Sequence, residues 1–140
     1  MLFNTSHKDK NIKKEISELV GSYGTFNGLW LTAKGRLRWK DIEISGYSKL
    51  FAGIMSRRNT AVKSVVKMMP RGILIEMNIR GSKFTWAVPY QYLSINEDDD
   101  LILSGKGEFL KLKVNSKYRK QLIRSVLLKT DITAENRTVA

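Results

Sequence analysis

The pattern of apolar and polar positions from 72 to 89 predicts a β-hairpin. Every odd position in 73–79 carries Ile or Met, which is the period of two typical of a half-buried strand. The sequence Arg-Gly-Ser-Lys at 80–83 supplies a turn. Phe, Trp and Val then resume the alternation at the even positions of 84–88. Because Pro89 cannot donate a hydrogen bond to a neighbouring strand, it should end the second strand or place it at an edge.

Shorter runs with the same period predict further strands on both sides of this hairpin. Lys34-Gly35 suits a two-residue turn between the first two of them. The apolar positions of the second strand change from odd to even near Lys40-Asp41, and one extra residue at a β-bulge would produce that change. The predicted strands are 26–33, 36–44, 49–55, 101–103 and 109–114. Of these, 49–55 has the weakest pattern.

Two segments in the middle of the chain are less regular. Apolar residues at 62, 65, 66 and 69 have helical spacing, whereas three valines within 61–69 favour a strand. We favour the strand. Residues 90–95 are expected to form a connector whose aromatic side chains pack under the sheet. The acidic run at 96–100 is expected to form a solvated turn.

An amphipathic helix is predicted over residues 8–20. Its apolar residues recur at i, i+4, i+7 and i+8, beginning with Ile12. Gly21 or Gly24 can end this helix. A helix of about 13 residues is marginal on its own, so we expect it to pack on the main body of the protein.

A second helix is predicted after residue 115. Asn115 or Ser116 can cap its first turn. Its buried side should carry Tyr118, Leu122, Ile123, Val126 and Leu127. Residues 131–140 carry no periodicity and are expected to form a flexible tail. The chain thus divides into an arm with a short helix at 1–25, a β-rich body with its helix at 26–130, and this tail.

The composition favours one folded domain. A chain of 140 residues can bury about two-thirds of its unfolded surface. The absence of cysteine excludes disulfides and thiolate metal sites. No apolar run approaches the roughly 18 residues of a spanning helix, and 1–8 lacks the apolar core of a signal peptide. We therefore expect a cytoplasmic protein, which a basic surface could hold at the periphery of a membrane.

The charge of the chain points to anionic partners. The formal net charge is +12, from 25 Lys and Arg against 13 Asp and Glu. The segment 44–75 holds six basic residues and no acidic one, and 101–130 holds eight basic residues and one acidic. A surface of this kind attracts phosphate groups, nucleic acid, acidic lipid or acidic protein. Charge that serves only solubility is the alternative.

The order of six or seven antiparallel strands followed by a helix resembles the pleckstrin-homology-like domains. Residues 28–39 resemble the opening hairpin of that family, in which a Lys ending the first strand precedes a basic-x-Arg on the second. Lys34, Arg36 and Arg38 match these positions. The segment 86–95 is similar to the strand-Pro-aromatic connector of bacterial members. The resemblance covers 26–130. It implies a barrel of two orthogonal sheets with the C-terminal helix over one open end, and it implies that the three matching residues bind phosphates.

Two groups of basic residues are candidate binding sites. The first lies on the face of the predicted hairpin opposite Leu37 and Trp39, and arginine in such a cluster can bind phosphate through two hydrogen bonds. It comprises Lys34, Arg36, Arg38 and Lys40. The second comprises Arg57, Arg58, Lys63 and Lys67. Solvated surface charge is the alternative for both groups, and for the second group we favour it.

Catalytic, metal and cofactor sites are not predicted. His7 is the only histidine, so neither a His-based catalytic triad nor a multi-histidine metal site has support. The acidic residues at 98–100 lack the spacing of a calcium loop. The sequence therefore predicts a noncatalytic binding module, without a cofactor, for an anionic membrane surface or an acidic protein. A nucleic-acid-binding protein using the same cations with Trp30, or a structural or regulatory subunit, are the alternatives.

Overall fold

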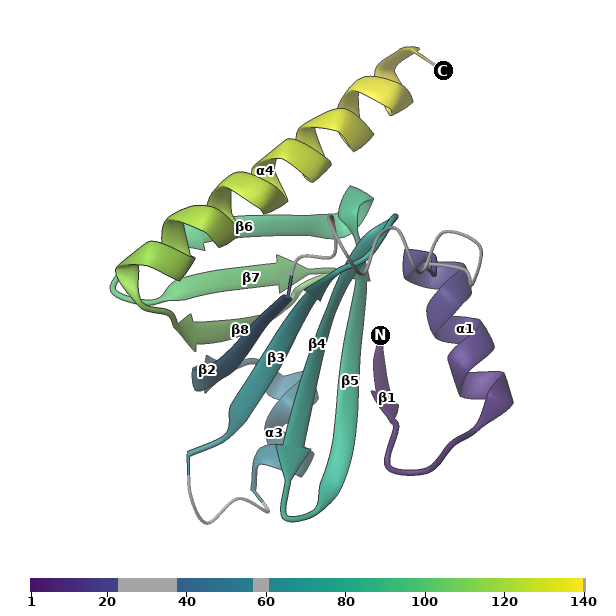
Figure 1. Cartoon of the computed structure of the whole chain (residues 1–140), viewed down its shortest axis with the longest axis vertical. Coiled ribbons are helices and arrows are strands. Elements are labelled where there is room, and N and C mark those ends of the chain that lie inside the picture. The colour runs from purple at the N-terminus through teal and green to yellow at the C-terminus, as the bar shows by residue number, and fades with distance from the viewer. Residues whose placement is uncertain (23–37, 57–60, 140) are drawn as a thin grey trace.

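The computed structural model of this protein describes residues 1–22, 38–56 and 61–139 (Figure 1). Within these ranges eight antiparallel strands form one open sheet, in the order β1-β5-β4-β3-β2-β8-β7-β6. The strands are β1 (Leu2–Asn4), β2 (Arg38–Tyr47), β3 (Lys63–Met68), β4 (Gly72–Ile79), β5 (Ser82–Pro89), β6 (Leu93–Glu97), β7 (Leu101–Gly105) and β8 (Glu108–Lys113). The predicted strand at 26–33 and its turn lie outside the described residues.

Helices occupy both faces of this sheet. They are α1 (Lys10–Val20), the short turns η1 (Lys49–Phe51), α3 (Ala52–Met55) and η2 (Tyr90–Tyr92), and α4 (Ser116–Val139). Side chains of α4 join the main core on the inner face, and α1 packs on a smaller apolar cluster of the outer face beside β5 (Figure 1). The prediction of a mainly β fold with terminal helices is confirmed.

The central hairpin is β4 and β5, as the alternation predicts. Ile79 is paired with Ser82, so the connection has two residues. These are Arg80 and Gly81, with φ of 50° and 82°, the positive values that a tight turn between twisted strands requires. The odd residues of β4 are buried in the main core. Leu74 breaks the expected pattern because it is also buried, on the outer face.

The N-terminal helix begins and ends as its sequence directs. The side chain of Asp9 accepts hydrogen bonds from the backbone at the first turn, and Gly21, with φ of 81°, follows the last helical residue. Val20 then packs with Leu74 and Ala87 under the helix. The sequence analysis predicts an arm before this helix and no strand within it, but the segment contains β1, which pairs with β5.

The predicted bulge in the second strand is confirmed. The register of β2 against β3 shifts between Trp39 and Ile42, and both of these side chains are buried. Asp41, within the shift, has a φ of 56°. The extra residue lets two side chains three positions apart point into the same core.

The prediction of a strand at 49–55 is wrong, since η1 and α3 occupy this segment. Phe51 and Met55 are buried, whereas Leu50 is exposed. A spacing of four between the buried residues matches one helical turn and not the alternation of a strand. The run of apolar residues predicted a strand, but the spacing of its buried residues is that of a helix.

The segments around the central hairpin are partly as predicted. Residues 61–69 contain β3, which confirms the strand assignment. In the connector 90–95, Tyr90 is buried and its hydroxyl donates to the carbonyl of Met69 at 2.5 Å. The expectation that Tyr92 also packs under the sheet is wrong, because its side chain is exposed. The connector ends in β6, an edge strand that was not predicted.

The last helix starts where the sequence places it and continues further. The Asn115 side chain accepts a hydrogen bond from the backbone N–H of Tyr118 at 2.9 Å. Leu122 and Val126 are fully buried, but Tyr118 and Leu127 are exposed, so the predicted buried side was too wide. The helix runs to Val139, through nearly all of the residues predicted as a tail.

Candidate functional site

Basic side chains of three adjacent strands share the outer face of the sheet. Arg38 of β2 is directly opposite Lys67 of β3, and Glu43 of β2 is opposite both Lys63 of β3 and Lys113 of β8. Directly paired residues of antiparallel strands project to the same face. We call this surface the basic sheet face; it comprises Arg38, Lys40, Lys63, Lys67, Lys111 and Lys113.

Two of these cations are neutralised by carboxylates of the same face. The Nζ of Lys67 lies 2.6 Å from Glu76, and the Nζ of Lys113 lies 3.4 Å from Glu43. Within 1–22, 38–56 and 61–131, no ion pair is formed by the other four residues of the face. The undescribed segments 23–37 and 57–60 contain no Asp or Glu, so neither can supply a carboxylate to them.

The carboxylate of Glu76 is held in its charged form by two lysines. Its oxygens lie 2.6 Å from Lys67 and 3.3 Å from Lys83. Burial alone would raise the pKa of Glu76, but the hydrogen bond and charge of Lys67, together with Lys83, outweigh burial and lower this pKa. This cluster has its own counter-charge, so Lys67 is not an available cation.

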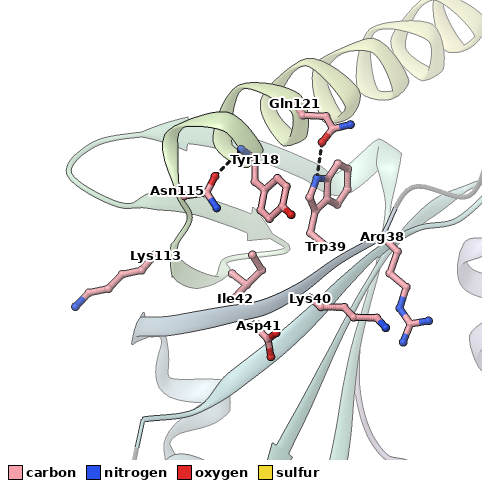
Figure 2. A pocket seen from close by; sticks show the side chains of 9 residues that line it. All are labelled: Arg38, Trp39, Lys40, Asp41, Ile42, Lys113, Asn115, Tyr118 and Gln121. Atoms are coloured by element: carbon pink, nitrogen blue, oxygen red, sulfur yellow. Dashed lines mark hydrogen bonds between the residues drawn. The ribbon is translucent and has the colours of Figure 1, made fainter.

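A groove of about 520 Å³ lies beside the basic sheet face, between β2 and the start of α4 (Figure 2). It is lined by the β2 residues from Arg38 to Ile42 and, from the end of β8, the connection after it and the start of α4, by Lys113, Asn115, Tyr118 and Gln121. The groove opens here because β2 pairs with β8 only from Glu43 onward. Its volume falls in the range of small-ligand sites.

The side chains of β2 divide between the two sides of the strand. Trp39 points toward α4, where its indole Nε1 donates to the side-chain oxygen of Gln121 at 3.1 Å (Figure 2). Arg38 and Lys40 extend to the opposite side of β2 (Figure 2). The buried Trp39 therefore anchors the strand to α4, while its basic neighbours face solvent.

The bulge adds a constrained acidic residue to the groove. Asp41 lines it and has a left-handed backbone conformation, which Asp tolerates better than most residues do. Strained backbone of this kind is often retained near binding sites.

The structure unites parts of the two basic groups that the sequence kept separate. Arg38 and Lys40 of the first group, and Lys63 and Lys67 of the second, lie on neighbouring strands. The remaining four residues lie outside the described ranges: Lys34, Arg36, Arg57 and Arg58. The sequence analysis missed the contribution of β8. Alternation does place Lys111 and Lys113 on one face of that strand, but nothing local indicates that it pairs with β2.

Other kinds of site have little support in the described ranges. They contain no group of three or more His, Asp or Glu side chains placed to hold a metal ion. The acidic turn after β6 is bound instead by Arg119, whose Nη2 donates to the carbonyl of Asp99 at 2.6 Å. None of the described helices has the length and apolar character needed to cross a membrane. Comparisons with protein families, curated proteins and solved structures found no match.

Proposed function

We propose that this chain is a noncatalytic binding module that presents the basic sheet face to an anionic membrane surface. The observation that carries the proposal is the group of four basic residues on adjacent strands that have no carboxylate partner within 1–22, 38–56 and 61–131: Arg38, Lys40, Lys63 and Lys111. Each basic residue near an anionic lipid surface contributes about 1 kcal/mol to binding. Four of them spread over a broad face suit an extended partner better than a compact ligand.

We also propose a distant relation of this fold to the pleckstrin-homology-like domains. The support is the run of antiparallel strands followed by a helix whose Leu122 and Val126 complete the main core. The described sheet has unpaired edges at β1 and β6, so closure into a barrel is part of the proposal. Of the three residues that match the phosphate-binding pattern, Arg38 lies on the exposed outer face.

The proposal is tested by reversing charges on the basic sheet face. Arg38→Glu/Lys40→Glu should abolish co-sedimentation with vesicles that contain phosphatidylserine, because it places two anions where the lipid charge approaches. The control is Arg80→Glu/Lys117→Glu, which makes the same change in net charge at two exposed residues away from this face. Control and wild-type protein should bind alike, and binding should weaken as salt is added.

Three outcomes would overturn the membrane assignment. The first is no binding of the wild-type protein to these vesicles, and the second is equal loss of binding in both double variants. The third is preferential binding of an oligonucleotide or of an acidic protein in parallel assays, which would give the basic sheet face a different partner. A steep loss of oligonucleotide affinity with salt would identify the nucleic-acid alternative.

A further inference from the structure

Helix α4 extends beyond the sheet that it covers (Figure 1). Val126 is fully buried, but the next two residues, Leu127 and Leu128, are 44% and 60% exposed. The helix nevertheless continues to Val139. Because a helical segment without packing is marginal in water, a partner that covers this part of α4 would stabilise it.

The exposed part of α4 has a face of defined composition. At about 100° per residue, four exposed residues fall within one arc, on the side of the helix opposite the buried Leu122 and Val126. They are Arg124, Leu127, Leu128 and Asp131. We call this surface the outer α4 face. Arg124 and Asp131 are seven residues apart, roughly 10 Å along the axis, so they do not pair within one chain.

The outer α4 face is complementary to itself. Its midpoint lies between Leu127 and Leu128, with Arg124 and Asp131 at equal distances on either side. In an antiparallel pair related by a twofold axis at this midpoint, Leu127 meets the partner's Leu128. Arg124 then meets the partner's Asp131, and the reverse contact follows by symmetry. The same register places Lys120 opposite position 135, which is Glu in the sequence.

We infer that a second copy of this chain binds along the outer α4 face in such an antiparallel pair. This pair would bury Leu127 and Leu128 of each copy and form two ion pairs between Arg124 and Asp131. Neither of these charges has an ion-pair partner within the described part of one copy. The inference goes beyond the proposed function. It leaves the basic sheet face of each copy free, because α4 packs on the other face of the sheet.

Charge exchange tests this arrangement in the full chain. Wild-type protein should show a concentration-dependent monomer–dimer equilibrium in sedimentation velocity. Arg124→Glu and Asp131→Arg should each weaken dimerisation by about tenfold or more, because each replaces two attractive contacts with two repulsive ones. The double variant Arg124→Glu/Asp131→Arg should restore it. A mixture of the two single variants should form heterodimers, since every reversed charge then meets its opposite.

A charge reversal elsewhere provides the control. Lys14→Glu, on the exposed side of α1, should leave dimerisation unchanged, and circular dichroism should show that all variants are folded. A monomeric wild-type protein at every concentration would overturn the inference. So would a dimer that ignores the single reversals, or one that the double variant fails to restore.

Cysteine crosslinking provides a second test, independent of charge. The chain contains no cysteine, so Leu128→Cys would introduce a single thiol close to the proposed twofold axis. This variant should form a disulfide-linked dimer under mild oxidation, whereas Lys14→Cys should not. Equal crosslinking of the two variants would show random collision and would contradict the inference.

Discussion

The outer face of the sheet has two ends that use basic residues differently. Over β4 and β5, α1 covers Leu74 and Ala87, and Glu76 binds both Lys67 and Lys83; we call this the closed end. Over β2, β3 and β8, the open end, four basic residues have no ion-pair partner in the described ranges. They are Arg38, Lys40, Lys63 and Lys111.

This difference separates charges that support the fold from charges available to a partner. At the closed end a lysine is held against a partly buried carboxylate beside an apolar cluster, so changes there should alter the free energy of unfolding. At the open end the basic side chains are mostly solvated, and isolated surface charges contribute little to stability. Substitutions there should alter binding and leave the fold intact.

The largest effect is expected from Leu74→Ala at the closed end. Leu74 is 7% exposed and packs against Val20 of α1. Its truncation should lower the free energy of unfolding by about 2–5 kcal/mol, from lost apolar burial and the resulting cavity. Urea denaturation at neutral pH measures this loss. A loss below about 1 kcal/mol would show that α1 is not packed on the sheet as described.

Glu76→Gln should have a smaller effect that depends on pH. The neutral amide cannot balance Lys67 and Lys83, so the variant should lose about 1 kcal/mol at neutral pH. The pKa of Glu76 is lowered in the folded protein from its ordinary value of 4.5. Its contribution is therefore fully present above 4.5 and is lost as the pH falls through the lower, folded-state pKa.

Urea denaturation of both proteins over a pH series checks the sign of this effect. The difference between wild type and Glu76→Gln should be constant from neutral pH down to the ordinary pKa and should shrink below it. A difference that grows on acidification would mean that burial, and not the two lysines, controls the pKa of Glu76.

The smallest effect on stability is expected from Asp41→Gly, in the bulge of the open end, for which the alanine variant is the comparison. An alanine at its φ of 56° should cost about 1 kcal/mol, because it keeps the Cβ that a left-handed conformation crowds but lacks the short polar side chain with which Asp tolerates this conformation. Asp41→Gly should stay within about 0.5 kcal/mol of the wild type, since glycine accepts this conformation but loses more entropy on folding. Urea denaturation that ranks the glycine variant below the alanine variant would contradict the strained bulge.

Local patterns predicted the elements whose evidence lies in adjacent residues. The hairpin of β4 and β5 follows from alternation around Arg80-Gly81, and the bulge follows from the change of phase after Trp39. Asn115 acts as a cap, as its position before a helical pattern indicates. By contrast, the strand predicted at 49–55 is wrong. Other apolar residues in this segment hid the helical spacing of four between Phe51 and Met55.

Pairing between distant strands could not be predicted in this way. The basic sheet face depends on the contact of β2 with β8, whose directly paired residues include Glu43 and Lys113. Seventy positions separate these two residues in the sequence, and no local signal specifies their register. Alternation therefore identified candidate faces on single strands, but it could not identify the joint surface of three strands.

The central claim is that residues from the two predicted basic groups act as one binding surface. The most direct measurement is the affinity of three single variants for vesicles containing phosphatidylserine. Arg38→Glu of β2 and Lys63→Glu of β3 should each weaken binding by roughly tenfold or more, as loss and reversal of a charge near the lipid imply, while Lys117→Glu on α4 should bind like the wild type. Equal weakening by all three variants would mean that only net charge matters. Unchanged binding of Lys63→Glu would mean that the second basic group does not take part in the binding surface.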